Sequence, residues 1–443
     1  MVDFSRLAEE IIFKAKKNGT SDAEIYISRS SSMDIKLKNS EVNETNIAEG
    51  LGIGIRLIKN KRQGYAYACD LSRQNIDKAL QLALRNSQYS DEDPYLNLPL
   101  KQSYQKLDLF DENISTTPME EKIALAREVE NLSQNMPYIQ KVEHAGFQES
   151  CGEVWLYNSH GVKAYEKYSY CALYATLLSE KNGEQDSGSG FSQDIRLANL
   201  DPKACAQMSA ERASRLLGAK SMTSAKCAIV FEPYIAAQFI SLLAGSFSGE
   251  NVLKGKSMYA DKLGALIAPE NFNLIDDSTL NGQLGSFSFD SEGTKAQRTA
   301  IIQKGVLNSF LYDCKSAAQA GTISTANSGR GSYKSAPSIA TSNYYVENGN
   351  IAPEEIIAQT SYGLYVTNIL GAHTANTLTG DFSFGASGIL IEKGKFTTPI
   401  RGVTIAGNLK DILAQIDLIG NDLTFFGAEG SPTLRVQNVQ ISG

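Results

Sequence analysis

The feature that most limits how this chain can fold is a succession of short strand-like runs after an initial helical stretch. Apolar residues between Phe4 and Ala15 recur at helical spacing, and Gly19 follows as a helix terminator. Turn residues divide the segment that follows into the strand-like runs 23–29, 33–38, 41–48, 51–58 and 64–69. Ser72 then caps a second predicted helix. Residues 1–88 are therefore expected to form an N-terminal α+β domain of helix, antiparallel meander and helix.

A second α+β unit is predicted after a polar, solvated linker at residues 89–106. Thr117 and Pro118 are a favourable cap and first residue for a helix. The strand-like runs 139–149, 153–158, 162–168 and 170–180, a polar glycine-rich loop or hairpin at 181–190 and a helix at 201–217 follow. These elements define a middle α+β domain, residues 107–220.

The remainder of the chain alternates short strands with glycine-bearing turns. Hairpin turns are predicted at 303–305, 347–349 and 392–394, and helices at 233–247, 353–359 and 409–419. This pattern is typical of a large, strand-rich, barrel-like C-terminal domain, residues 225–443. Three domains also suit 443 residues, at about 100 to 200 residues per domain. The predicted fold class is α+β throughout.

Charge and composition exclude several kinds of partner. The chain has 42 Lys and Arg against 49 Asp and Glu, a formal net charge of −7. It lacks the basic surplus that phosphate binding requires, so neither nucleic acid nor a membrane is expected as a direct partner. No apolar run approaches the roughly 18 to 20 residues of a membrane span, and the first residues do not resemble a signal peptide. Six scattered cysteines are expected to be reduced. We therefore expect a cytoplasmic protein.

Two glycine-rich segments resemble nucleotide-binding motifs without matching them. Gly50, Gly52 and Gly54 lack the G-x-G-x-x-G spacing and run into a strand instead of opening a helix. Small residues that let another backbone approach closely are the better interpretation. Residues 249–257 have one residue too many between their glycines for a phosphate-binding loop, and a predicted helix precedes them.

Zinc peptidase motifs are absent from the sequence. Neither H-E-x-x-H nor H-E-x-x-x-H occurs, and the three histidines are His144, His160 and His373. Each is expected to be an ordinary surface or core histidine, although a trio gathered by the fold stays open.

The most unusual segment is residues 371–388, which is dense in glycine and hydroxyl side chains. Such composition demands special backbone geometry and offers N–H groups and oxygens to a ligand. It predicts either a tight connector between strands or a loop that contacts a peptide or partner. Asp381 is a candidate general base, but an aspartate after glycine is more often a turn former. The candidate contact residues are Asn376, Thr379, Gly380, Asp381, Phe382, Ser383, Gly385, Ser387 and Gly388, with His373 as an outlying candidate.

The same segment resembles the C-terminal signature of a known family. TGDFSFGASG (379–388), GKFTTPIRGVTIAGNL (394–409) and IGNDL (419–423) are similar to the TldD/PmbA family. Further similar segments at 51–72, 289–299 and 305–313 extend the resemblance over essentially the whole chain. It is strongest to the PmbA, or TldE, branch of the family, long labelled a modulator of DNA gyrase.

The resemblance implies a subunit of a heteromeric zinc metallopeptidase. In this family the TldD subunit carries an H-E-x-x-x-H helix and a cysteine ligand, and TldE pairs with it without those ligands. Here the corresponding helix, 233–247, contains no histidine, and the glycine-rich segment contains no cysteine. We therefore expect no catalytic residue, metal ligand or cofactor in this chain, and zinc in a TldD-like partner subunit. The expected substrates are small or unfolded polypeptides, which the complex trims or degrades.

Two other functions stay open at this point. One is a stand-alone homodimeric protein that binds peptides or regulates without proteolysis. The other is a peptidase with an unorthodox site built from His373, Asp381 and their neighbours.

Overall fold

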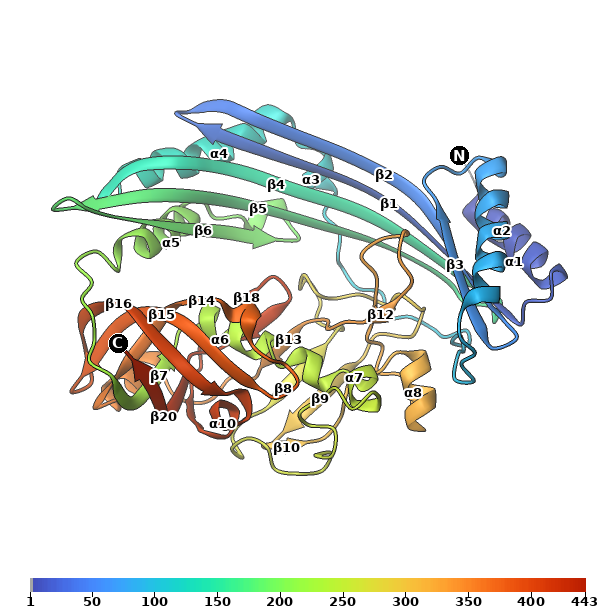
Figure 1. Ribbon diagram of the computed structural model, residues 1–443. Helices are drawn as coiled ribbons and strands as arrows, with labels where there is room; N and C mark the ends of the chain where they lie inside the picture. Colours follow the sequence, from blue (N-terminus) through green and yellow to red (C-terminus); the bar gives the residue numbers. More distant parts are fainter. Residues whose placement is uncertain (1–2) are drawn as a thin grey trace.

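The computed structural model describes residues 3–443 and confirms the α+β fold class. A long curved sheet arches over a C-terminal half that contains a barrel (Figure 1). The first half comprises α1 (Phe4–Lys17), β1 (Asp22–Lys38), β2 (Glu41–Lys59), β3 (Arg62–Ala68), α2 (Arg73–Tyr89), α3 (Glu112–Thr116), α4 (Met119–Gln134), β4 (Ile139–Asn158), β5 (Lys163–Lys181), β6 (Glu184–Asp194), the 3-10 turn η1 (Leu197–Asn199) and α5 (Pro202–Ser214).

The second half begins at β7 (Ala225–Phe231). It continues through α6 (Pro233–Ser241), η2 (Ala244–Phe247), α7 (Gly249–Leu253), β8 (Leu274–Asp277), β9 (Arg298–Gln303), β10 (Val306–Leu307), α8 (Cys314–Ala320), β11 (Ser328–Gly329), β12 (Ser338–Ile339), β13 (Tyr344–Val346), α9 (Pro353–Ala358), β14 (Tyr362–Leu370), η3 (Ala372–Thr374), β15 (Asp381–Glu392), β16 (Lys395–Asn408), α10 (Leu409–Ala414), β17 (Ile416–Ile419), β18 (Thr424–Phe426), β19 (Glu429–Ser431) and β20 (Leu434–Ser442).

One antiparallel sheet, in the order β3-β2-β1-β4-β5-β6, contains the strands of the first two predicted domains. The division of residues 23–69 into five strands is wrong, because the first two runs form β1 and the next two form β2. Ser30 pairs with Gly50 and Ser31 with Glu49 in one unbroken ladder. These short polar and small residues interrupt the apolar alternation, but the ladder hydrogen bonds keep the backbone extended. The runs predicted in the middle domain merge into β4 and β5 in the same way.

Two helix pairs cover one face of this sheet. Ile25 and Ile27 of β1 pack in a cluster with α1 and α2, and Ile35 and Leu37 pack in another with α4 and α5. Since side chains alternate along a strand, these odd-numbered residues share a face. The helix predicted to begin at Thr117 instead follows the short α3, and Pro118 is the cap residue of α4.

The opposite face of the sheet meets the C-terminal half. Tyr26 and Leu156 share a small buried cluster with Phe289. Tyr333 lies against Gly52, where an added Cβ would come within 2.2 Å of its ring, and its carbonyl oxygen accepts a hydrogen bond from Tyr65. At Gly54 an added Cβ would come within 2.8 Å of the carbonyl oxygen of Tyr333, so the interpretation of the glycine run as a place of close backbone approach is confirmed. Most of the linker at 89–106 is exposed, as predicted, but Leu98 is buried and Asn97 donates a hydrogen bond to the carbonyl oxygen of Cys314, so the linker also packs against the C-terminal half.

The C-terminal half contains a closed barrel, as predicted. Strands β16-β15-β14-β7-β20 pair in sequence and β20 pairs again with β16. A second sheet, β10-β9-β8-β13-β19-β18, packs beside it around a shared core that includes α6. The turns at Lys304 and Lys393 are hairpins, with positive φ at each lysine and the glycine after it.

Two expectations for this half are wrong. Residues 347–349 do not form a hairpin, because Tyr344 and Tyr345 pair with β8 and β19 instead of with a following strand. The helix predicted at 409–419 ends at Ala414, and the apolar residues after it form β17, which pairs with β20. The domain boundaries 1–88, 107–220 and 225–443 stay predictions. No helix within residues 3–443 is long and apolar enough to cross a membrane.

Candidate functional site

A cleft of about 610 Å³ lies between the end of α5 and one side of the barrel. The middle part of the chain contributes β6 and α5, and the barrel contributes the start of α6 and parts of β14, β15 and β16. The residues used below that line it are Asp186, Ser189, Phe191, Arg212, Arg215, Tyr234, Ile235, Gln238, residues 367–370, Gly385, Ser387 and Arg401. We call it the α5–barrel cleft.

An ion pair holds α5 against the beginning of α6. Both Glu232 carboxylate oxygens accept hydrogen bonds from Arg215, at 2.7 and 3.0 Å, and Arg215 also donates to the carbonyl oxygen of Thr367 at 2.6 Å. Burial raises the pKa of Glu232, although its pairing with Arg215 acts in the opposite direction. Arg401 pairs with Asp186 across the same cleft. These contacts join the middle part of the chain to the barrel with charged groups that satisfy one another.

Arg212 lies on α5, one helical turn before Arg215, in a different environment. Its guanidinium carbon is 4.3 Å from the ring centroid of Tyr234 and 5.7 Å from that of Phe191. It donates one hydrogen bond, to the carbonyl oxygen of Ser189 at 3.1 Å. Burial lowers the pKa of Arg212, and the nearby carboxylate of Glu232 only partly opposes this.

The barrel presents backbone as well as side chains to the cleft. β7 pairs with β14 only along residues 363–366, so residues 368–370 have a strand partner on β15 but none on the other side within the described chain, whereas the carbonyl oxygen of Thr367 is engaged by Arg215. Gly385 lies beside them, paired with Leu370. A strand that continues past its neighbour leaves N–H and C=O groups free for an extended peptide.

The structure separates the predicted contact residues into three groups. Gly385 and Ser387 line the α5–barrel cleft. Phe382 is buried in the barrel core and stacks on Phe384, whereas Ser383 lies exposed on the same strand. Gly388 lies against β14, where an added Cβ would approach the carbonyl oxygen of Tyr365 to 2.0 Å.

The rest form the turn that leads into β15, whose first residue is Asp381. Asn376 accepts hydrogen bonds from the N–H groups of Leu378 and Thr379, and Gly380 has a positive φ of 87°. Thr379 and Asn408 donate to Asp381, and these hydrogen bonds lower the pKa of its carboxyl group. Asp381 is thus a turn former whose oxygens are already engaged. His373 is exposed on η3.

The residues present do not fit a zinc site. On α6, Ile235, Ala236, Phe239 and Ile240 are buried in the core and offer no ligand atoms. Glu232, the carboxylate nearest this helix, is held by Arg215. Among residues 3–443, no three His, Cys, Asp or Glu side chains are grouped as metal ligands would be. His144 lies against Tyr174 and His160 pairs with Asp22, on other elements. We therefore assign no metal-dependent step to this chain.

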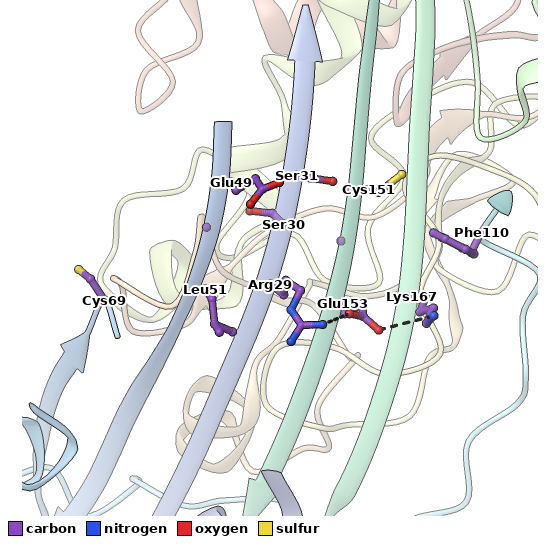
Figure 2. A pocket seen from close by; sticks show the side chains of 12 residues that line it. Arg29, Ser30, Ser31, Glu49, Leu51, Cys69, Phe110, Cys151, Glu153 and Lys167 are labelled. Atoms are coloured by element: carbon purple, nitrogen blue, oxygen red, sulfur yellow. Dashed lines mark hydrogen bonds and ion pairs between the residues drawn. The ribbon is translucent and has the colours of Figure 1, made fainter. Parts of the chain in front are cut away.

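A second hollow lies on the helix-bearing face of the long sheet (Figure 2). Three of its charged groups are paired with one another, since Glu153 lies 3.2 Å from Arg29 and 3.6 Å from Lys167. Burial raises the pKa of the Cys151 thiol to about 11, so it is protonated at neutral pH and a poor nucleophile. This hollow offers no activated group, and the α5–barrel cleft is the stronger candidate.

The architecture is a curved sheet with helices on one face, joined to a closed barrel that carries a cleft beside the first helix after its opening strand. Three family models match the chain, described as PmbA/TldA metallopeptidase domain 1 (residues 23–87), central domain (112–217) and C-terminal domain (224–443). Together they span nearly all of it. The chain belongs to the PmbA/TldD family.

Known relatives are similar to this chain along nearly its full length. Metalloprotease PmbA of Escherichia coli O157:H7 is 27% identical, over 94% of this chain and 92% of that protein. A crystal structure from Thermotoga maritima, described as a modulator of a DNA gyrase, superposes with a TM-score of 0.91 at 23% identity, over 99% and 100% of the two chains. TldE from Thermococcus kodakarensis has a TM-score of 0.90 at 24% identity, covering 98% and 99%. The two structures establish the fold.

Sequence reasoning missed the charged residues of the cleft. Arg212 and Arg215 are three residues apart on a predicted helix, which places them on one face, but nothing local indicates what that face meets. Glu232 and Arg401 come from segments distant in the sequence. Only the fold brings these four side chains together.

Proposed function

We propose that this chain is the non-catalytic, TldE-like subunit of a zinc metallopeptidase complex, acting with a TldD-like partner in the cytoplasm on small or unfolded polypeptides. The observation that carries the proposal is the apolar α6, which supplies no metal ligand at the position where the resemblance implies the zinc-binding helix of the catalytic subunit. Six free cysteines support a reducing compartment.

The α5–barrel cleft supports a role in holding the substrate. Residues 368–370 give an extended peptide a strand edge on the side away from β15, and Gly385 of β15 adds no side chain to the cleft that this edge lines. An added Cβ at Gly385 would be 3.4 Å from the Cβ of Leu370, an ordinary contact. A larger side chain there would fill the cleft without displacing backbone.

The decisive experiment measures cleavage of an unstructured reporter peptide by this protein alone, by a partner with an H-E-x-x-x-H helix alone, and by their mixture, each with and without a chelator. We expect cleavage in the mixture only, abolished by the chelator. Cleavage by this protein alone, after repurification to constant specific activity, would contradict the proposal and favour an unrecognised catalytic site. Peptide binding without cleavage in any mixture would favour a stand-alone binding protein.

Substituting valine for Gly385 tests the role of the cleft in the assembled complex. We expect peptide cleavage by the mixture to fall at least about tenfold, because the valine side chain occupies part of the cleft that Gly385 lines. The circular dichroism spectrum and melting temperature of the subunit should be retained. Unchanged turnover in a folded Gly385→Val variant would exclude this part of the cleft from substrate binding.

A further inference from the structure

The α5–barrel cleft contains three arginines, and one of them lacks a carboxylate. Glu232 is engaged by Arg215 and Asp186 by Arg401. Arg212 forms no ion pair with any residue of the described chain, 3–443. The cleft therefore carries an excess positive charge at Arg212, in a chain whose net charge is −7.

The contacts of Arg212 orient its guanidinium group and leave most of its donors free. Tyr234 and Phe191 both lie close to the group, and Tyr234 itself packs edge-to-face on Phe426. Stacking on an aromatic ring holds the planar group without consuming its N–H donors. Of the five N–H donors that arginine has, one is used, by Ser189. The free donors form the fork that binds carboxylates with two parallel hydrogen bonds.

If Arg212 had only a structural role, keeping its charge without an ion-pair partner would be energetically unfavourable. Partial burial disfavours the cation and the charge of Glu232 offsets this only in part, as the lowered pKa of Arg212 reflects. A carboxylate supplied by a ligand would offset the penalty, and the strand edge at residues 368–370 lies in the same cleft to bind the backbone of that ligand.

We propose that Arg212 binds a carboxylate of the polypeptide substrate and makes this subunit select peptides that carry one there. The carboxylate is either the α-carboxylate of the peptide or the side chain of an aspartate or glutamate, and the chemistry of recognition is the same for both. This inference rests on the proposed function, because it assigns the substrate class of the same cleft.

The test measures binding to the purified full-length chain by fluorescence anisotropy. The probe is a fluorescein-labelled peptide of glycine, serine, alanine and valine that ends in glutamate. Three further probes carry a C-terminal amide, glutamine in place of the glutamate, or both changes. We expect the doubly neutral peptide to bind at least about tenfold more weakly than the doubly charged one, as charge-assisted bidentate bonds imply. The two singly changed peptides identify which carboxylate Arg212 binds.

Substitutions at Arg212 test whether this residue causes the preference for peptides that carry a carboxylate. Arg212→Gln should bind all four peptides as weakly as wild type binds the neutral one, and Arg212→Lys should be intermediate because it keeps the charge but loses the fork. The matched control is Arg85→Gln, which removes the same charge from exposed α2 and should bind like wild type. Equal wild-type binding of all four peptides, or no binding up to about 1 mM, would overturn the inference.

Two outcomes separate this inference from the function on which it rests. If the mixture with the partner cleaves peptides, but neither removal of the peptide carboxylates nor the Arg212→Gln substitution changes peptide binding, only the inference fails. If Arg212→Gln loses assembly with the partner subunit while peptide binding is retained, the carboxylate belongs to that subunit and the inference is overturned. Carboxylate-dependent binding without cleavage by any mixture would retain the inference and refute the accessory role in proteolysis.

Discussion

At the scale of single residues, burial of a carboxyl group makes the free energy of unfolding depend measurably on pH. Asp276 of β8 is 2% exposed and accepts hydrogen bonds from Ser342 and Asn327, and burial raises its pKa to about 6. Between about pH 4 and pH 6 the folded chain holds a proton that the unfolded chain has released, so this group's contribution to stability falls as the pH rises. We expect the free energy of unfolding of wild type, relative to Asp276→Asn, to fall by up to about 3 kcal/mol from pH 4 to 7.

Thermal or denaturant unfolding of both proteins across this range checks the prediction. Asp417 is the control with the opposite sign. Burial acts to raise its pKa, but hydrogen bonds and the charge of Arg435 outweigh burial and lower it. Asp417→Asn should therefore lose stability mainly above the pKa of an unfolded aspartate. A constant difference between wild type and Asp276→Asn at every pH would contradict the assignment.

At the scale of elements, two nearby glycines of β15, Gly385 and Gly388, have different structural roles. Gly388 leaves no room for a side chain, because an added Cβ would come within 2.0 Å of the carbonyl oxygen of Tyr365 on β14. Gly385 faces the cleft with an ordinary contact of 3.4 Å. We expect Gly388→Ala to destabilise the barrel by about 1 to 3 kcal/mol, the usual cost of overpacking. Urea unfolding monitored by circular dichroism measures it.

Gly385→Ala is the matched control and should change stability by no more than about 0.5 kcal/mol. Equal destabilisation by the two alanines would show that both glycines serve barrel packing and that Gly385 is not a cleft residue.

At the scale of the whole molecule, a buried ion network joins the long sheet to the C-terminal half. Arg56 of β2 pairs with Glu24 of β1 at 2.5 Å and with Glu292 of the other half at 2.7 Å, and Arg330 pairs with Glu24 from the other side. Breaking a buried pair leaves a carboxylate without its counter-ion, which costs about 3 to 5 kcal/mol. Arg56→Met should lower the melting temperature and increase hydrogen exchange in residues that join the two halves.

The double variant Arg56→Met with Glu292→Gln separates charge from packing. It should recover part of the lost stability, since Glu24 keeps Arg330 and Glu292 no longer needs a counter-ion. If the double variant is less stable than the single one, the network contributes through shape and hydrogen bonds and not through charge balance.

Features that depend on residues close together in the sequence could be predicted, whereas features that depend on contacts between distant segments could not. Hairpins at Lys304 and Lys393 were predictable because two residues of positive φ suffice to make each turn. The unbroken course of β1 through Ser30 and Ser31 was not, because it depends on neighbours from β2 and β4. Part of the predicted helix at 409–419 became β17 because β20 pairs with it. The contact segment 371–388 could be recognised as unusual, but its division into turn, core strand and cleft could not.

The sequence by itself determined the α+β class, the apolar character of α6 without metal ligands, and the local turns, because periodicity and turn chemistry act between residues a few positions apart. The tertiary structure alone decided that Arg212 lacks an acidic partner while Arg215 has one. Both lie on one helix, and the difference arises from Glu232, which belongs to the start of α6 and reaches only Arg215. Charge pairing depends on distance in space, which the order of residues does not specify.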